Sequence, residues 1–478
     1  MLFNSVEFTI FLPVVFLLSW FVFNKNKKQQ NILLLISSFF FYACWDWRFL
    51  FLLMFTILLD YFTGIQMCKT DIQKQRKFWL FLSVVINLGF LGVFKYYNFF
   101  AESFADFLST LGFIVHPSTL KVILPVGISF YTFHGLSYVI DIYYKKIKSE
   151  RNFIDYALFV SFFPLLVAGP IERATHLLPQ LKQKRTFNPT QAIDGLRQIL
   201  WGIFKKTVIA DNCASLVNHI FPNYSDLSGS TLVLGAALFA FQIYCDFSGY
   251  SDIALGTARL FGITLLRNFA FPYFSRDLAE FWRRWHISLT SWFKDYVYIP
   301  LGGSRGGTWM KIRNTYIMFL VSGFWHGANW TFLVWGFLHA TFLLPLMLTK
   351  QNRKHMDIVA ADRMLPSFSD FLKICFTFTL LLLSMIFFRA ENLTHAFDYF
   401  ACMPVNLISV PEIFVSKILI LSLIFMIVIE WIGRRDQYAI ETIGKNWPRV
   451  IRWGFYWGIA AFIIVYAASQ QQFIYFQF

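Results

Sequence analysis

The sequence contains few charged residues for its length. Asp, Glu, Lys and Arg make up 14% of its 478 positions, whereas a soluble domain usually carries about 25%. Hydrophobic residues fill 57% of the chain, and the mean hydropathy is +0.53. No segment has enough polar residues to form a separate soluble domain. We therefore expect one membrane domain over residues 1–478.

Motifs of several common enzyme classes are missing. The chain has no Gly-x-Ser-x-Gly turn, no Walker loop and no His-Glu-x-x-His pair. An ordinary hydrolase, an NTPase and a zinc protease therefore lack support. Six cysteines are present, but none has the spacing of a disulfide framework or a metal site. We expect no metal ligands.

Acidic residues are also scarce. The chain has 27 acidic and 42 basic residues, which gives a formal net charge of +15. On a soluble protein this charge would suggest nucleic-acid binding, but here the basic residues lie in short loops between apolar runs. Membrane topology and anionic lipid headgroups account for basic residues in such loops. We expect membrane lipids as partners and no nucleic acid.

Apolar segments, by contrast, are abundant, and many approach the 20 or so residues that cross a bilayer. We predict spans at about 8–23, 31–45, 48–66, 78–98, 122–143, 152–169, 230–250, 328–349, 370–389, 413–432 and 451–470. Shorter or interrupted apolar pieces lie near 193–221 and 312–325. The pattern predicts an all-α polytopic membrane protein with about eleven transmembrane helices and no internal repeat.

Loop charges predict how the spans are oriented. The first span is preceded by Glu7 and followed by the lysine-rich loop 24–29, which is the reverse of a cleavable signal peptide. We expect a retained span with its N-terminus outside. The positive-inside rule then places loop 68–77 in the cytoplasm and loop 99–118 outside. Region 170–327 is too irregular for a topology assignment.

That irregular region holds polar residues beside apolar runs. The segment Gln242–Asp252 contains two carboxylates and two serines, which are costly against lipid. One interpretation is a broken-helix turn whose Ser and Asp residues cap exposed backbone groups. The other is a lining for the path of a polar substrate, with Asp246, Ser251 and Asp252 as binding residues. The residues alone leave both open.

The segment Ser275–Pro300 is predicted to be a helix in the membrane interface. Its Leu, Phe and Trp residues recur at helical spacing, and Arg283 and Arg284 fall on the opposite face. Basic residues opposite an aromatic stripe are typical of an interfacial helix. His286 falls at the edge of the stripe, about 80° from its centre. It is either an interfacial histidine without a catalytic task or a group that reaches a buried polar site.

A second histidine, His326, stands in an apolar segment between Gly323 and Gly327. These glycines allow another backbone to approach closely, or allow the helix to break. A neutral histidine suits general-base catalysis near pH 7. It also carries no permanent charge, so it costs less to bury in a membrane than a carboxylate.

The alternative for His326 is a buried histidine that makes only hydrogen bonds between helices. In the catalytic interpretation, Asn329 or a nearby carbonyl would hold the tautomer of His326. His134 and His339 lie in comparable apolar runs, and composition does not distinguish them from His326.

Three longer motifs follow one another along the chain. They are Trp285-His-Ile-Ser-Leu289, Asp295-Tyr-Val-Tyr-Ile-Pro-Leu-Gly-Gly303 and Gly323-Phe-Trp-His-Gly-Ala-Asn-Trp330. Further pieces lie at 124–130, 137–143, 168–173, 205–211, 246–252, 387–391 and 473–478. In this order they resemble the signature of the membrane-bound O-acyltransferase (MBOAT) family. The resemblance covers nearly the whole chain and is closest to the branch that holds the membrane subunit of alginate O-acetyltransferase.

The resemblance implies a fold and a site. Family members have about eleven spans plus re-entrant helices around a central funnel. The family's essential histidine matches His326, and its second histidine matches His286, so we expect these two to be catalytic. We expect the substrate-binding residues to include Arg283, Arg284, Asp246, Ser251, Asp252 and Asn329.

The resemblance also implies an activity. We expect transfer of an acetyl group from a cytoplasmic thioester, acetyl-coenzyme A, to a polysaccharide outside the membrane, with no bound cofactor. The expected location is the bacterial inner membrane, and the expected partner is a periplasmic or membrane-anchored protein of the SGNH type. Alternatives are D-alanyl transfer from a carrier protein to teichoic acid, a transporter or export channel, and a non-catalytic scaffold.

Overall fold

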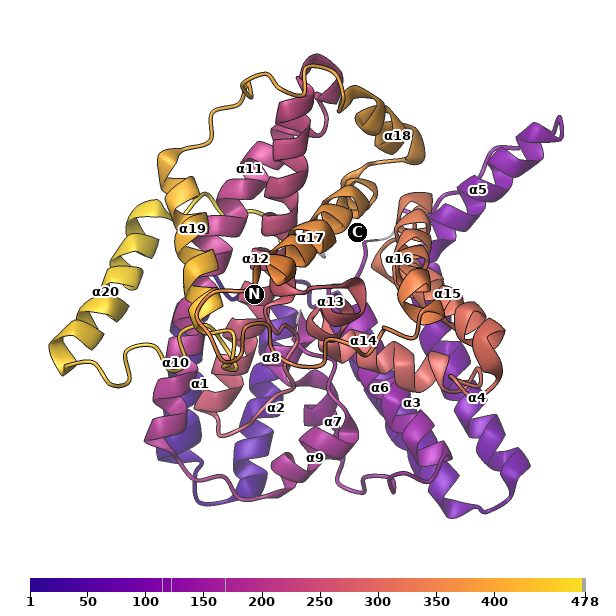
Figure 1. Ribbon diagram of the computed structural model, residues 1–478. Coiled ribbons are helices and arrows are strands. Elements are labelled where there is room, and N and C mark those ends of the chain that lie inside the picture. The colour runs from indigo at the N-terminus through magenta and orange to yellow at the C-terminus, as the bar shows by residue number, and fades with distance from the viewer. Residues whose placement is uncertain (114, 122, 168, 475–478) are drawn as a thin grey trace. The chain divides into compact units, whose positions relative to one another are not determined.

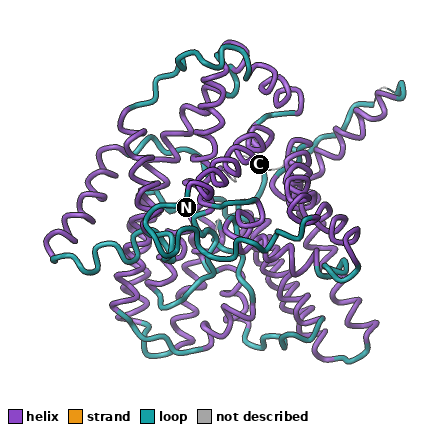
Figure 2. The backbone as a smooth tube through the Cα atoms, in the orientation of Figure 1, coloured by secondary structure: helices purple, strands orange, loops and turns teal. Residues whose placement is uncertain are grey.

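The computed structural model describes residues 1–478 apart from 114, 122, 168 and 475–478. The described residues form helices and loops and contain no strand (Figure 2). The all-α class predicted from the sequence is therefore confirmed. The predicted start of one span at 122, and the motif positions 168 and 475–478, lie outside the described residues.

The chain forms two compact units. The first comprises residues 1–192 and 257–266, and the second comprises 193–256 and 267–478. The helices that begin in the first unit are α1 Val6–Leu17, η1 Leu18–Val22, α2 Lys27–Ala43, α3 Arg48–Lys69, α4 Gln73–Leu91, η2 Gly92–Tyr96, α5 Tyr97–Thr110, α6 Ile128–Tyr143, α7 Phe153–Ser161, α8 Phe163–Leu166, α9 Ala174–Lys182 and α10 Pro189–Ile203.

The second unit contains most of α10 and all of the predicted site residues. Its further helices are η3 Phe204–Ala210, α11 Asp211–Ile220, η4 Tyr224–Asp226, α12 Gly229–Leu260, η5 Pro272–Phe274, α13 Leu278–Arg284, α14 Ile287–Phe293, η6 Lys294–Tyr298, α15 Gly307–His326, α16 Trp330–Leu348, α17 Phe368–Arg389, α18 Leu393–Cys402, α19 Lys417–Ile432 and α20 Arg449–Tyr466. The last four residues of α12 belong to the first unit.

Five helical segments of the described chain are long and apolar enough to cross a membrane. They are Arg48–Lys69, Gln73–Thr110, Gly229–Leu260, Trp330–Leu348 and Phe368–Arg389. Each contains or closely matches a span predicted from the sequence. The other predicted spans fall mostly on shorter helices, so the count of eleven stays a prediction.

Three predicted boundaries are wrong. The predicted span 152–169 is broken at Phe162, between α7 and α8. Pro164 in the first turn of α8 has no N–H with which to continue the helical ladder from α7. The predicted loop 99–118 is helical as far as Thr110, since α5 continues α4 through the π-helix η2. The piece near 312–325 is the complete 20-residue helix α15.

In the first unit, a buried carboxylate connects three helices. Helices α3, α4 and α6 lie side by side (Figure 1). Asp60 of α3 accepts hydrogen bonds from Ser83 (2.6 Å) and Asn87 (2.9 Å) of α4. On α6, a Cβ added at Gly135 would lie 2.0 Å from Asp60 Oδ2. Only glycine leaves room there for the carboxylate, which is therefore satisfied inside the bundle instead of facing lipid.

In the second unit, α10 and α12 touch through their backbones. A Cβ added at Gly202 would lie 2.6 Å from the carbonyl oxygen of Gly249, and one added at Gly256 would lie 2.4 Å from that of Gly195. The two glycines on each helix are seven residues apart, so they share one helix face. Small residues at such spacing allow close helix packing in membranes.

Helices α15 and α16 also approach each other closely at glycines, and they lie side by side in Figure 1. A Cβ added at Gly323 would lie 2.2 Å from the carbonyl oxygen of Phe332, and one added at Gly336 would lie 2.3 Å from that of Phe319. The prediction that Gly323 allows close backbone approach is confirmed. This contact fixes the end of α15, where His326 is the last residue.

The loop between α18 and α19 is anchored to the start of α12. The amide of Gly229 donates to Val405 O (2.6 Å). Glu412 accepts from the hydroxyls of Thr231 and Ser228. These donors, Thr231 foremost, lower the pKa of Glu412 from 4.5 to about 2.

We predict that Gly202→Ala destabilises the second unit. Its methyl group would meet backbone, which cannot move aside without separating α10 from α12, and such overpacking costs about 1–3 kcal/mol. Gly454→Ala in α20 is the matched control, because a Cβ there meets nothing within 4 Å. Thermal unfolding of the protein in detergent compares the two, and equal melting temperatures would contradict the close contact.

We predict that the Glu412 anchor is lost in acid. Because the folded-state pKa lies below that of the unfolded chain, the stabilisation is complete above about pH 4.5 and disappears as the pH falls towards 2. The melting temperature of the wild type should exceed that of Glu412→Ala at pH 6, and the difference should shrink across this range. A difference that does not depend on pH would refute the assignment.

Candidate active site

The interfacial segment is not one helix. Helix α13 ends at Arg284, α14 begins at Ile287, and His286 between them has left-handed backbone at φ 41° and ψ 54°. The prediction of a continuous helix, with His286 at the edge of its stripe, is therefore wrong. The helical ladder is replaced by bonds to a neighbouring segment: Ala270 N donates to Arg284 O, and Ile287 N donates to Asn268 O, both at 2.9 Å.

The ring of His286 is buried among aromatic side chains. Only 1% of the residue is exposed. The Phe247 ring of α12 meets it edge to face, with centroids 4.6 Å apart and planes at 86°. The Trp325 ring lies 6.0 Å away, measured between centroids. The break in the helix thus turns His286 inward.

His326 reaches the same aromatic cluster from α15. The helix ends at this residue because Gly327 is extended, at φ −164° and ψ 152°. The His326 ring, 3% exposed, lies 4.9 Å from Trp325, 5.2 Å from Trp335 and 5.2 Å from Phe388 between centroids. Trp325 contacts both histidines, so the structure brings His286 and His326 together around one tryptophan.

The other two candidate histidines differ from this pair. His339 of α16 is buried, and its Nε2 is hydrogen-bonded to Ser384 Oγ at 3.1 Å. This contact matches the structural alternative of a histidine that links helices. His134 lies in α6 of the first unit, among the residues buried there. The His339 ring also lies 4.7 Å from the Trp335 ring that contacts His326, so it belongs to the same aromatic cluster. Trp325 is the ring that contacts both His286 and His326.

Asn329 caps a helix. Its Oδ1 accepts from Thr331 N (3.0 Å) at the start of α16, and its Nδ2 donates to Glu391 O (2.7 Å). The side chain therefore ties the start of α16 to the loop after α17. The sequence expectation that Asn329 or a carbonyl orients His326 stays a prediction.

Arg283 and Arg284 lie beside the loop that follows α16. Arg283 donates to Asn352 O (3.0 Å) and His355 O (2.6 Å). Arg284 donates to Glu280 (2.8 Å) and to Asp357 O (3.0 Å). The Arg284 side chain is 11% exposed. Both arginines hold this loop against α13.

Asp246 belongs to a buried ion cluster. Lys206 Nζ lies 2.7 Å from Asp246 Oδ1 and 2.7 Å from Asp211 Oδ1, and each of these side chains is at most 4% exposed. The other oxygen of Asp246 accepts from Ile474 N at 2.7 Å. The interpretation of this segment as a broken-helix turn is wrong, because α12 continues through it. Asp246 is instead paired with Lys206 and with the backbone N–H of Ile474.

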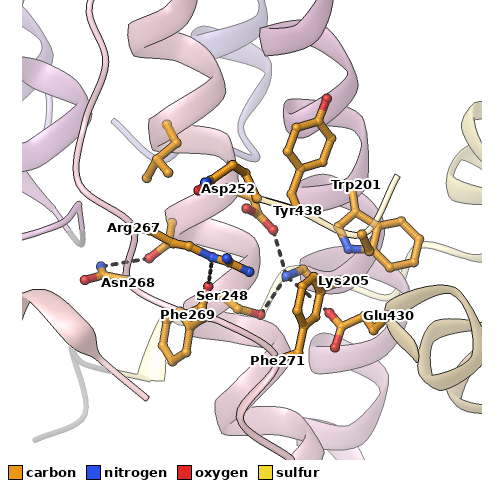
Figure 3. Close-up of a pocket in the computed structure, with 14 residues that line it drawn as sticks. Trp201, Lys205, Ser248, Asp252, Arg267, Asn268, Phe269, Phe271, Glu430 and Tyr438 are labelled. Carbon is orange, nitrogen blue, oxygen red and sulfur yellow. Dashed lines mark hydrogen bonds and ion pairs between the residues drawn. The ribbon is translucent and has the colours of Figure 1, made fainter. Parts of the chain in front are cut away.

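Asp252 and Ser251 line a small cavity one to two turns further along α12 (Figure 3). Lys205 lies at its centre, 2.7 Å from Asp252 Oδ2, 2.8 Å from Ser248 Oγ and 3.7 Å from Glu430 Oε1. The cavity has a volume of about 20 Å³, which is room for about one water.

Hydrogen bonds lead from the wall of the cavity towards His286. Arg267 and Asn268 form one wall (Figure 3). Asn268 Nδ2 donates to Ser251 Oγ at 3.0 Å, and Ser288 Oγ donates to Asn268 Oδ1 at 2.5 Å. A polar network thus joins Ser251 of α12 to Ser288 at the start of α14, two residues after His286.

Lys205, Lys206 and Glu430 are buried residues of the ion clusters that were not predicted as site residues from the sequence. A signal was available, because each is an ionisable residue in an otherwise apolar stretch, where such residues indicate partners or function. Asn268 had no such signal, since it lies in an irregular loop. Among the residues that the structure describes, no group of three or more His, Cys, Asp or Glu side chains could hold a metal ion.

Comparison with known proteins gives consistent matches. Residues 143–388 match the sequence model of the membrane-bound O-acyltransferase family. The chain is 35% identical over 470 residues to the probable alginate O-acetylase of Pseudomonas putida, covering 91% of this chain and 92% of that protein. It is 34% identical over 530 residues to the peptidoglycan O-acetyltransferase of Helicobacter pylori, covering 100% and 98%. It is 30% identical over 313 residues to the teichoic acid D-alanyltransferase of Streptococcus thermophilus, covering 61% and 75%.

We predict that Lys206→Met strongly destabilises the protein. It leaves two buried carboxylates without their cation, and breaking a buried ion pair in this way costs about 3–5 kcal/mol. Lys445→Met, at an exposed lysine of the same unit, should change stability by less than about 0.5 kcal/mol. Thermal unfolding in detergent compares the two variants. If Lys206→Met is as stable as Lys445→Met, the cluster does not hold the unit together.

Proposed function

The chain belongs to the membrane-bound O-acyltransferase family and is an O-acyltransferase, and we propose that it acetylates a polysaccharide outside the membrane. It is a multi-pass membrane protein by its family and its apolar helices. The proposed donor is a cytoplasmic thioester, acetyl-coenzyme A. The proposed location is the bacterial inner membrane, where such a donor and such an acceptor are on opposite sides.

One observation carries the proposal: a buried histidine in the break between α13 and α14 and a buried histidine at the end of α15 contact the same tryptophan, Trp325. A histidine exchanges a proton near neutral pH, so it serves both as base and as acid. Aromatic walls keep bulk water away from the pair, which favours transfer to a sugar hydroxyl over hydrolysis of the donor.

The proposed chemistry uses the histidines in different roles. His326 takes the proton of the acceptor hydroxyl while the hydroxyl oxygen attacks the thioester carbonyl. The new C–O bond forms, the C–S bond breaks, and the proton passes from His326 to the departing thiolate. His286 orients the acceptor or stabilises the oxyanion. Balance requires no redox partner and no metal.

The donor's phosphates are proposed to meet Arg283 and Arg284. A guanidinium has five N–H donors, and the loop carbonyls occupy only two of those on Arg283. We propose that four polar residues support the lining of the substrate path, since each bonds to other groups of the protein: Asp246, Ser251, Asp252 and Asn329.

The acceptor class rests on the relatives. Those reported above are named for acting on alginate, peptidoglycan and teichoic acid, which are all polymers outside the cytoplasmic membrane. We propose a glycan of this kind, reached directly or by relay through a partner protein of the SGNH type. Both units are proposed to serve as one membrane domain, because the family match covers residues of each.

D-alanyl transfer to teichoic acid is the second candidate. The relatives with that name match a smaller share of this chain than the two O-acetylating ones, 61% against 91% and 100%. Acetyl transfer is therefore favoured. A transporter or export channel would not need the paired histidines, so a histidine variant separates it from both transferases.

We predict that His326→Gln inserts normally but loses acetyl transfer by about 10²–10⁴-fold, the usual contribution of a general base. His339→Gln is the matched control, since this histidine is equally buried but bonds to Ser384. Mass spectrometry of surface glycans measures O-acetylation, and immunoblotting of membranes measures the amount of protein. Full acetylation by His326→Gln would contradict the assignment of His326 as the general base and would favour the transporter interpretation.

A further inference from the structure

His286 has a backbone conformation that residues other than glycine rarely adopt. At φ 41° it lies in the left-handed region, where the Cβ approaches the following carbonyl. Such a conformation persists only where the surrounding structure holds it. Neighbouring groups must therefore hold the two-residue break between α13 and α14.

Asn268 binds the chain on the far side of the break. Its backbone carbonyl accepts from Ile287 N, the residue directly after His286. Two residues later, Ala270 N donates to Arg284 O, before the break. These two bonds bracket His286, so the position of Asn268 decides where the left-handed residue lies.

The side chain of Asn268 is itself fixed at both ends. Nδ2 donates to Ser251 Oγ of α12 (3.0 Å), and Oδ1 accepts from Ser288 Oγ of α14 (2.5 Å). Asn268 and Ser288 are 1% exposed, and Ser251 is 4% exposed. A buried amide that satisfies groups on two helices costs free energy to displace.

The same face of α12 carries the ring that touches His286. Phe247 lies one turn before Ser251 on this helix, and its ring meets the His286 ring edge to face at 4.6 Å. The bond from Asn268 to Ser251 therefore sets both the backbone and the ring of His286 against one rigid helix. Figure 3 shows Asn268 next to Arg267, at the wall of the cavity on this side of α12.

We propose that Asn268 is a positioning residue for His286, acting through Ser251 and Ser288. Ser251, expected from the sequence to bind substrate, then serves to anchor Asn268. The inference deepens the proposed function and rests on it, because it presumes that His286 acts on the reacting groups. It assigns Asn268 no contact with the substrate.

The test measures catalysis and stability separately. Membrane vesicles that contain each variant receive radiolabelled acetyl-coenzyme A and acceptor glycan, and kcat and KM for acetyl-coenzyme A are measured per amount of protein. Asn268→Ala and Ser288→Ala should lower kcat on the order of 10²-fold, as displacement of a catalytic group by about 1 Å does. KM for the donor should stay within about twofold, because no donor contact is lost.

Matched controls remove the effect of a lost buried hydrogen bond. Asn314 is a fully buried asparagine of α15 whose amide donates to Leu301 O and Gly303 O. Ser291, one turn after Ser288 on α14, is half-buried, and its hydroxyl donates to the backbone carbonyl of Ser288 at 2.9 Å. Asn314→Ala and Ser291→Ala should lower the melting temperature without lowering kcat. Ser288→Thr, which keeps the hydroxyl, should restore most of the kcat lost in Ser288→Ala.

The outcomes separate the inference from the function on which it rests. If His286→Ala is inactive while Asn268→Ala and Ser288→Ala keep the kcat of the wild type, the positioning role is overturned and the proposed function stands. If His286→Ala is fully active, the proposed role of His286 fails together with the inference. If the controls lose as much kcat as Asn268→Ala, the effect is general destabilisation, and the positioning role is again overturned.

Discussion

The close contact between α10 and α12 is the constraint on which the second unit depends. Glycines spaced seven residues apart on both helices bring the two backbones together. Only at this separation do the lysines of η3 reach the carboxylates of α12, with Lys205 against Asp252 and Lys206 against Asp246. Charges buried in a membrane protein are tolerated when they are paired in this way.

The residues of α12 in and beside these ion clusters have different partners. Asp246 holds Lys206 and the chain near the C-terminus through Ile474 N. Ser251, one turn later, belongs to the network of Asn268, and Phe247 between them meets His286. One rigid helix therefore carries a structural charge pair and the support of a candidate catalytic residue. Its polar segment is continuous helix and not the broken turn that its composition allowed.

The two histidines are embedded differently from these charges. Both rings are surrounded by aromatic side chains, and Trp325 contacts both. The aromatic walls exclude water, which suits transfer of an acyl group between two non-water partners.

The sequence by itself determined the membrane class, the helical fold, the family and His326 as a candidate base, because composition, apolar run length and motif order are properties of the chain alone. It also indicated that Gly323 marks a close approach. It did not predict the break at His286, since helical periodicity continues across it and only the bonds from Asn268 and Ala270 replace the ladder. Nor could it assign Asp246 to Lys206 and Asp252 to Lys205. Those pairings depend on which helix faces meet, and that was decided only by tertiary packing, where each buried charge must find its partner.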